Sequence, residues 1–206
     1  MDNQEKVWDS IADKWDEFRE ILSPSVEKFL KDKSGRILDL GCGSGRNFSG
    51  FSKNAQIYAV DFSREMLKHA EEKAKKLGLN AKTFCSNSDK IPFENDYFDS
   101  AICIALLHCI PEKDKRKETI KEIYRALKPS SQVLISVWGR NSPRLRNKEK
   151  ECFIPWTIQT REEGKIKQER FTYIYDLKEL EEEVRETGFK IARVWEERNI
   201  NIIAEK

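Results

Sequence analysis

Short apolar runs rich in β-branched residues recur along the chain, and stretches with helical periodicity separate them. Runs of this length and composition are typical of strands that are buried on both faces of a sheet. The pattern predicts five such strands, at residues 36–40, 56–60, 81–85, 98–104 and 132–138.

Two of the helical patterns carry their own start and stop signals. Residues 63–78 begin with Ser63 as a candidate cap, end at Gly78 and place four apolar residues on one stripe. Residues 114–129 repeat this arrangement and end at Pro129. The alternation of strands and helices predicts a parallel sheet with helices on both faces.

The end of the chain breaks this alternation. Two apolar runs, at residues 189–197 and 199–205, follow each other almost directly. Such close neighbours are antiparallel, because a parallel return needs a crossover of roughly a dozen residues or more. We therefore expect an α/β fold with a mostly parallel seven-stranded sheet and an antiparallel last strand.

The remaining segments are expected to join the same domain. Residues 3–33 predict N-terminal helices, the first carrying an apolar stripe that includes Trp8 and Trp15, the second lying around residues 23–33. A chain of 206 residues suggests a single domain covering 1–206. Residues 140–170 lack a clear period, and we interpret them as an insertion between a strand and a helix.

Charge changes this picture only locally. The 38 basic and 36 acidic residues nearly cancel, so the overall charge of +2 neither indicates nor excludes nucleic acid. The insertion, however, holds nine basic and five acidic residues, which leaves it at +4 and the rest of the chain at about −2. This asymmetry suits contacts to phosphates, although a solvated charged loop has the same composition.

Cysteine usage and hydropathy indicate the cellular compartment that we expect for the protein. The five cysteines are odd in number, form no CxxC pair and follow no secretory-type apolar segment, which predicts reduced thiols in a cytoplasmic protein. No apolar run approaches the roughly 20 residues of a membrane span, so no membrane contact is expected. Histidine, cysteine and acidic residues show no ligand spacing, and no metal is predicted on this chain.

The stretch ILDLGCGSGRN, residues 37–47, places three glycines within five positions directly after the first strand. Glycine permits positive φ and removes the Cβ atom that would keep a ligand away. Ligands of such sheets bind beyond the carboxyl ends of the strands. The glycines Gly41, Gly43 and Gly45 therefore predict a small-molecule site.

Three details distinguish this site from a nicotinamide dinucleotide site. The spacing is GxGxG instead of GxGxxG, and Asp39 stands before the loop, where it would repel a pyrophosphate. Asp61 ends the second strand, placed to accept hydrogen bonds from two ribose hydroxyls. An acidic, glycine-lined pocket suits a cationic sulfonium ligand that carries an amine and no phosphate, namely S-adenosylmethionine.

The motifs LDLGCGSG, VDFS and LKHA resemble those of the class I S-adenosylmethionine-dependent methyltransferases, and the resemblance covers nearly the whole chain. It implies their Rossmann-like fold and places Gly41 and Gly43 beside the methionine part of the cofactor. Asp61 would hold the ribose, and Asp39 would either contact the ligand or orient the loop. The other cofactor-binding positions implied are Cys42, Phe62 beside the adenine, Asn87 and Ser88 at the adenine edge, and Ala105.

Later segments resemble one group within that family. IALLHCIPEKDKRKETIKEIYRALKP, FIPW, RFTYIYDLKELEEEV and NINIIAEK are similar to the tRNA methyltransferases that esterify a carboxymethyl group on the wobble uridine. The chain departs from their pattern at Cys109, where relatives carry a second histidine, at Thr172 and Tyr173, which replace Tyr and His, and at Ile200, which replaces Trp. These departures lie near the expected substrate pocket.

The implied acceptor sets the chemistry. A carboxylate is already ionised at neutral pH, so it needs no general base, only alignment and a group that holds it in place. We expect Arg19, His108 and Arg170 to serve the reaction, with Arg140, Trp156 and Tyr173 contacting the substrate. The alternatives are surface arginines, a buried core histidine and a tryptophan that anchors the insertion.

The resemblance also implies partners. Relatives act on tRNA and work as heterodimers with a small zinc-binding activator subunit that covers a sheet edge, which in the usual strand order is residues 81–85, with Phe84 and Cys85. Two other functions stay open. One is a methyltransferase for a quinone precursor or a carboxylate metabolite, and the other is a non-catalytic binding module.

Overall fold

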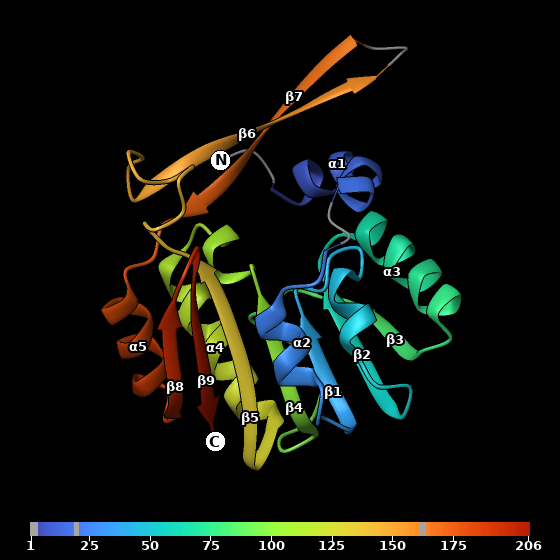
Figure 1. The fold of residues 1–206 in the computed structure, drawn as a ribbon, viewed down its shortest axis with the longest axis vertical. Coiled ribbons are helices and arrows are strands. Elements are labelled where there is room, and N and C mark those ends of the chain that lie inside the picture. The colour runs from blue at the N-terminus through green and yellow to red at the C-terminus, as the bar shows by residue number, and fades with distance from the viewer. Residues whose placement is uncertain (1–3, 19–20, 161–163) are drawn as a thin grey trace.

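The computed structural model describes residues 4–18, 21–160 and 164–206. Seven strands form one sheet in the order β3-β2-β1-β4-β5-β9-β8 (Figure 1). The first five strands run parallel, and β9 is antiparallel to both of its neighbours, as expected from the sequence. The strands are β1 (Gly35–Leu40), β2 (Ala55–Asp61), β3 (Asn80–Cys85), β4 (Phe98–Ile104), β5 (Leu127–Trp138), β8 (Lys190–Glu196) and β9 (Asn199–Glu205).

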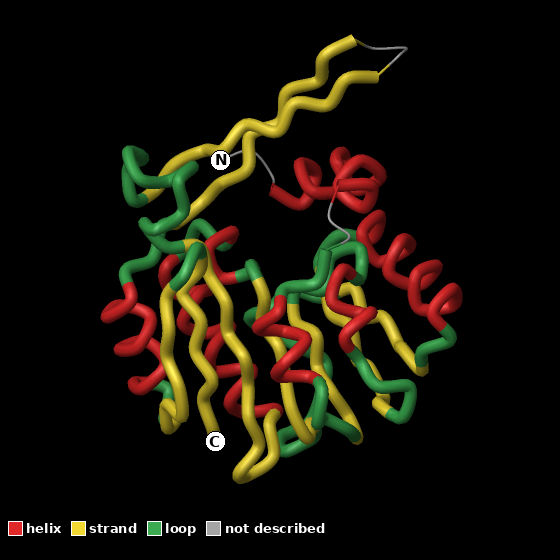
Figure 2. Tube along the Cα trace, in the orientation of Figure 1, coloured by secondary structure: helices red, strands yellow, loops and turns green. Residues whose placement is uncertain are grey.

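Helices cover both faces of this sheet, which confirms the predicted layers (Figure 2). On one face lie α2 (Pro24–Leu30), the short 3₁₀ turn η1 (Arg46–Gly50) and α3 (Arg64–Leu77). On the other lie α4 (Lys113–Ala126) and α5 (Leu177–Glu186). Within β1, Ile37 packs into the first layer and Leu38 into the second, because successive side chains of a strand point to opposite faces.

The ends of α3 lie where the sequence signals them. The Ser63 Oγ accepts a hydrogen bond from the backbone N–H of Met66 at 3.1 Å, and Gly78 follows the helix with φ +63°. A side-chain oxygen at the first position and a left-handed glycine at the last satisfy backbone groups that a helix leaves open. Both signals are confirmed.

The end of α4 differs from the prediction. The helix stops at Ala126, not at Pro129, and β5 begins at Leu127. Lys128 precedes a proline and is therefore disfavoured in the helical region. Ser130 takes the left-handed φ of +63° and donates its N–H to the carbonyl of Lys206 at 2.8 Å. This turn is therefore part of the lengthened strand.

The insertion is a β-hairpin, which the sequence analysis did not predict. Antiparallel strands β6 (Glu151–Thr160) and β7 (Gly164–Tyr173) rise beyond the carboxyl ends of the central strands (Figures 1 and 2). Pro155, which is paired with Glu169, interrupts the alternating pattern that would mark β6 in the sequence. A two-stranded hairpin is marginal alone, so its packing partners stabilise it.

The hairpin packs against α1 (Gln4–Phe18) and against the short turn after β4. Trp15 and Trp156 pack with their ring centroids 5.1 Å apart, and the backbone N–H of Phe171 donates to Oε1 of Gln4 at 3.0 Å. The opposite side of α1 faces α3, where the Oγ of Ser63 donates to Asp9 at 2.5 Å. Helix α1 thus joins α3 to the hairpin and roofs the end of the sheet (Figure 1).

The described part of the chain contains no helix with the length and apolar character needed to cross a membrane. All five cysteines are free thiols.

Candidate functional site

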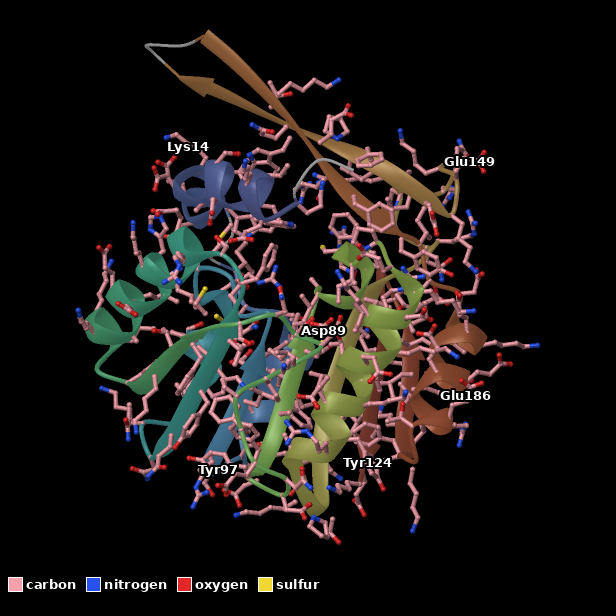
Figure 3. The ribbon with its side chains drawn as sticks, turned by 180° about the vertical axis from the view of Figure 1, so that it is seen from behind. Lys14, Asp89, Tyr97, Tyr124, Glu149 and Glu186 are labelled. Atoms are coloured by element: carbon pink, nitrogen blue, oxygen red, sulfur yellow. The ribbon has the colours of Figure 1, made fainter. Side chains whose placement is uncertain are left out.

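A cavity of about 290 Å³ lies where β1 and β2 end and the chain leaves β4, and it adjoins a smaller chamber of about 80 Å³. The two share lining residues from three sources: Trp8 of α1, Gly41, Asp61 and Phe62 at the ends of β1 and β2, and Leu106 and Cys109 after β4. Asp89 lines the larger part and lies at the end of the sheet that faces α1 and the hairpin, whereas Tyr97 lies at the opposite end (Figure 3). The cavity is therefore at the place that such sheets offer to a ligand.

The glycines of the loop have different structural roles. Gly41 and Gly43 have φ values of +73° and +54°. A Cβ atom on Gly41 would meet the side chain of Leu106 at 2.8 Å, so this glycine permits close packing. A Cβ atom on Gly43 would meet no atom within 4 Å and would project into open space. Gly43 therefore leaves room beside the backbone for a ligand.

Asp61 ties the second strand to the glycine loop. Its Oδ2 accepts the N–H of Gly43 at 2.9 Å, and its Oδ1 accepts the N–H of Ser63 at 3.0 Å. Burial raises the pKa of the Asp61 carboxyl to about 6, although the backbone hydrogen bonds favour the charged form. Each oxygen keeps a second lone pair, so the carboxylate can still accept hydrogen bonds from a ligand in the cavity.

Asp39 lies behind the loop. It is fully buried, and both of its carboxylate oxygens lie 3.4 Å from Nδ2 of Asn47. Burial raises its pKa to about 7. Of the two roles expected for Asp39, these contacts favour the orientation of the loop.

The other residues expected to bind the cofactor line the two chambers. Cys42 and Ala105 line the smaller one, Asn87 and Ser88 the larger one, and Phe62 both. Ala105 adopts a φ of +60° at the turn after β4, and its N–H donates to the carbonyl of Ser136 at 2.8 Å. The structure thus brings all of these positions to one cavity.

His108 precedes Cys109 of the cavity wall but lines neither chamber itself, and it is buried, with 2% of its surface exposed. Its Nδ1 accepts the backbone N–H of Trp138 at 3.2 Å, and its ring stacks on Trp138 with centroids 4.7 Å apart. Burial, together with the positive charges of Arg170 and Arg46, lowers the pKa of His108 to about 3. The imidazole is therefore neutral, and because Nδ1 accepts, the proton belongs on Nε2.

Arg170 of β7 is 5% exposed and lies among three indole rings. Its guanidinium carbon is 5.6, 5.0 and 5.1 Å from the ring centroids of Trp8, Trp15 and Trp156. Cation–π contacts of this kind are worth about 0.5–2 kcal/mol each. Arg170 therefore fastens α1 to the hairpin above the cavity, and Trp156 belongs to the same cluster.

Five of the residues expected to serve the reaction or the substrate line neither chamber: His108, Trp156 and Arg170, described above, and Arg140 and Tyr173. Arg140 is exposed, with Nη1 donating to the carbonyl of Lys148 at 3.2 Å. Tyr173 is buried at the base of the hairpin, where its hydroxyl donates to Glu179 and the guanidinium of Arg116 stacks 3.9 Å from its ring centroid. Arg19 lies outside the described residues.

Several lining residues were missed by the sequence analysis. Trp8 and Cys109 line both chambers, and Arg46 and Asn47 line the smaller one. The sequence did hold a signal for the last two, because they directly follow the glycine loop. Trp8 was read only as part of an apolar helix stripe, since its distance from the loop in the sequence concealed the contact.

Two observations fit the amino acid part of S-adenosylmethionine. Gly43 leaves open space at the loop, and the buried Oδ1 of Asn47 has no hydrogen-bond partner among the described residues. A carbonyl oxygen of this kind accepts a hydrogen bond from an ammonium group. The carboxylate oxygens of Asp61 can accept hydrogen bonds from hydroxyl groups of a ligand in the same cavity.

Comparison with known proteins agrees with this geometry. Residues 37–130 match the family model described as "Methyltransferase domain". An S-adenosylmethionine-dependent methyltransferase of Methanosarcina mazei superposes with a TM-score of 0.70 at 26% identity, covering 90% of this chain and 98% of that one.

Two curated relatives have named substrates. The tRNA (carboxymethyluridine(34)-5-O)-methyltransferase of Arabidopsis thaliana is 32% identical over 136 residues, which cover 65% of this chain and 32% of the relative. The ubiquinone/menaquinone biosynthesis C-methyltransferase of Proteus mirabilis is 28% identical over 145 residues, covering 63% of this chain and 57% of the relative. The chain thus spans about a third of the length of the first and somewhat more than half of the second.

The matched domain contains the glycine loop and Asp61, and the likeness to the Methanosarcina mazei structure extends over most of the chain. The strand order, the cavity at the carboxyl ends of β1, β2 and β4 and the roof over it all agree with a cofactor site for S-adenosylmethionine. Residues 37–130 of this chain form a methyltransferase domain, and the chain has the fold of the S-adenosylmethionine-dependent methyltransferases.

Proposed function

We propose that this chain methylates the carboxylate of a 5-carboxymethyluridine at the wobble position of tRNA, forming the methyl ester. The observation that carries the proposal is that the two uncharged titratable side chains of the turn after β4, His108 and Cys109, are not poised to accept a proton from an acceptor. His108 has a pKa of about 3, burial raises the pKa of the Cys109 thiol to about 12, and Asp61 is hydrogen-bonded to backbone amides. An ionised carboxylate is an acceptor that needs no base.

Each nearby side chain then has a role in this reaction. When bound, S-adenosylmethionine supplies an electrophilic methyl group on a sulfonium. Asp61 accepts hydrogen bonds from the ribose hydroxyls, and Phe62 flanks the adenine. The Nε2–H of His108 donates a hydrogen bond to the acceptor, and Arg170 supplies a fixed positive charge on the roof side.

The hairpin is the proposed contact for RNA. Basic residues on it and on the segment before it include Arg144, Arg146, Lys148 and Lys167, which are exposed. Contacts between such residues and phosphates strengthen binding at low salt and weaken it as salt displaces them. The hairpin lies beyond the carboxyl ends of the central strands, the end of the sheet that also holds the cavity, so RNA bound there would lie on the same side of the molecule as the reaction site.

A small zinc-binding activator subunit is proposed at the free edge of the sheet. Strand β3 is the edge strand, as the sequence analysis expected, and Phe84 on it is only partly buried. An edge strand offers unpaired backbone groups to a partner strand. Co-expression with the activator is expected to raise the soluble yield and the turnover of the chain. Full activity of the isolated chain would contradict this part of the proposal.

The deciding experiment is mass spectrometry of nucleosides after incubation of tRNA with the co-expressed enzyme and methyl-labelled S-adenosylmethionine. We expect label in the methyl ester of 5-carboxymethyluridine at the wobble position. The matched control is the Asp61→Asn variant, for which we expect little label. Label in tRNA at any other position, or none, would overturn the proposed acceptor.

A small-molecule methyltransferase is the second candidate, favoured by the similarity to the Proteus mirabilis enzyme. It predicts label in quinone precursors or carboxylate metabolites and no salt-sensitive affinity for RNA. A titration of anticodon stem-loop RNA at two salt concentrations distinguishes the two candidates, because only the tRNA enzyme loses affinity as salt rises.

A further inference from the structure

Phe153 of β6 exposes an aromatic ring on the hairpin. Of the aromatic side chains on β6 and β7 that the structure describes, it alone is exposed, with 50% of its surface open to solvent. Trp156, which the sequence analysis expected to contact the substrate, packs instead against Trp15 of α1. Phe153 lies three positions before Trp156, so its ring is on the opposite face of the hairpin, away from α1.

The ring of Phe153 is held in place near the larger chamber. It packs against Phe171 with the centroids 5.9 Å apart and the planes at 79°. The N–H of Phe171 donates to Oε1 of Gln4, and Gln4 lines the larger chamber. An edge-to-face contact uses at most one face of a ring, so at least one face of Phe153 is not covered by Phe171 and can receive another flat group.

Three exposed cations lie on the segment that leads into β6: Arg144, Arg146 and Lys148. Within the described residues, none of them has a carboxylate within the 4.0 Å of an ion pair. The next acid in the sequence, Glu149, is exposed as well and lies at the base of the hairpin (Figure 3). A group of unpaired cations on the surface attracts a polyanion.

This segment is ordered before any partner binds. Consecutive backbone hydrogen bonds of 2.9–3.2 Å, each spanning three residues, link Gly139 to Lys148. The side chain of Leu145, between the two arginines, is fully buried and anchors the segment to the domain. A surface that is ordered in advance loses less conformational entropy on binding than a flexible loop does.

The exposed ring and the cations together fit single-stranded RNA. Proteins bind single strands by combining cations for the phosphates with aromatic rings on which unpaired bases stack. Duplex RNA keeps its bases stacked inside the helix and offers no base face to the ring. A protein partner fits less well, because the exposed half of one ring supplies about 100 Å², whereas a stable protein interface takes roughly 800 Å² from each side.

We propose that Phe153 stacks on an unpaired base of an RNA strand whose phosphates contact Arg144, Arg146 and Lys148. The proposal rests on the proposed function, which makes this strand the anticodon loop. Because the ring adjoins Phe171 and through it Gln4 of the larger chamber, the stacked base belongs to a nucleotide close to the one that is methylated. Phe153 is thus a residue of RNA recognition and takes no part in methyl transfer.

The first test is fluorescence anisotropy of the full chain, saturated with S-adenosylhomocysteine, with an anticodon stem-loop RNA and with an RNA duplex of equal length. We expect Phe153→Leu to bind the stem-loop about tenfold more weakly and the duplex as the native chain does, as expected for the loss of one stacked base. Phe153→Tyr should keep the native affinity. The matched control is Ile21→Ala, which changes the other exposed large apolar residue among those described and should have no effect.

The second test is the salt dependence of the same binding. The variant with Arg144→Gln, Arg146→Gln and Lys148→Gln should lower the slope of log affinity against log salt by about 2, since each phosphate contact to a single strand contributes roughly 0.7. Phe153→Leu should leave this slope unchanged. Thermal melting of each variant identifies any loss of fold.

The third test is photochemical crosslinking of the stem-loop with 5-iodouridine at single positions of the loop, followed by mass spectrometry of the peptides. We expect a crosslink to Phe153 from one loop position. Loss of this crosslink in Phe153→Leu, in a variant that melts like the native chain, supports direct stacking over an indirect effect on the fold.

The proposal is overturned if Phe153→Leu keeps the native affinity for the stem-loop, if it loses equal affinity for the duplex, or if no loop position crosslinks to Phe153. The proposed function fails separately. A native chain that binds and crosslinks the stem-loop but forms no methyl ester on tRNA overturns the proposed acceptor alone. A native chain that methylates tRNA while Phe153→Leu binds the stem-loop normally overturns the stacking proposal alone.

Discussion

Asp61 at the end of β2 holds the backbone of Gly43, with its Oδ2 atom 2.9 Å from the amide nitrogen of the glycine. The bond joins residues 18 positions apart and fixes the loop after β1 to the loop after β2. One carboxylate therefore shapes the glycine loop and also borders both chambers of the cavity. Its charge state links pH to cofactor binding.

We expect cofactor affinity to fall as the pH drops below 6. The pKa of Asp61 is about 6, and a protonated carboxyl loses the charge that attracts ribose hydroxyls and a cationic ligand. At pH 5 about one molecule in ten is ionised, so the affinity is roughly tenfold lower than at pH 7. Calorimetry between pH 5 and 8 measures this. Asp61→Asn should bind weakly without this pH step, and an equal step in the variant would contradict the assignment.

The same group shifts the stability of the ligand-free chain in the opposite direction. Its pKa is higher in the folded chain than the ordinary value near 3.9, so the folded state holds more protons between about pH 4 and 6. The contribution of Asp61 to stability is therefore largest at low pH and is lost as pH rises through 6. Urea unfolding of the native chain and Asp61→Asn at pH 5 and 7 tests this. A native chain that gains stability relative to Asp61→Asn between pH 5 and pH 7 would contradict it.

Gly43→Ala should remove cofactor binding without unfolding the chain. The left-handed φ of +54° costs an alanine about 1–2 kcal/mol, and the added methyl group projects into the open space at the loop. Gly78→Ala is the matched control. It has φ +63° with only the tip of Lys53 within 4 Å, but it lies at the end of α3, away from the cavity.

The two glycine variants are expected to lose similar stability in thermal melts. Only Gly43→Ala should lose affinity for S-adenosylhomocysteine, by at least about tenfold if the methyl group displaces the ligand. Equal affinities for the two variants would show that the loop does not approach the ligand at this position.

His108 should not titrate between pH 5 and 8. With a pKa of about 3, its imidazole stays neutral over that range. The chain has two histidines, so two ring signals are expected in a proton–carbon correlation spectrum, and the one that disappears in His108→Gln belongs to His108. This signal should keep its position from pH 5 to 8. A midpoint near pH 6.5 would contradict the buried, neutral assignment.

Arg170→Met should loosen the roof over the cavity. The guanidinium contacts three indole rings, two of them on α1, so its loss removes contacts that hold this helix to the hairpin. Amide hydrogen exchange across residues 4–18 should become about tenfold faster, as expected for a loss of about 1.4 kcal/mol. The amides of β1 should not change.

Arg140→Met is the control for this roof. Arg140 precedes the hairpin and contacts the carbonyl of Lys148 and the carboxylate of Asp176, with no contact to α1 among those described. It should leave exchange in α1 unchanged. Similar acceleration in both variants would mean that Arg170 does not hold the helix in place.

The sequence by itself determined the strands of the central sheet and the helices between them, the antiparallel finish, the caps of α3 and the glycine loop with Asp61. Each of these is encoded locally, because the period of apolar residues defines an element and its buried face. A glycine-rich loop and a carboxylate at the end of a strand likewise indicate a ligand site from their sequence positions alone.

The tertiary structure alone decided which distant residues surround the cavity. The hairpin was hidden by Pro155 and by its weak periodicity, and its fold carries Arg170 to the tryptophans of α1, more than 150 positions earlier in the chain. It also buries Tyr173 against Arg116, away from the cavity, and leaves Arg46 as a cation in the chamber wall. Local periodicity carries no information on such contacts, because they depend on how the hairpin and α1 pack over the end of the sheet.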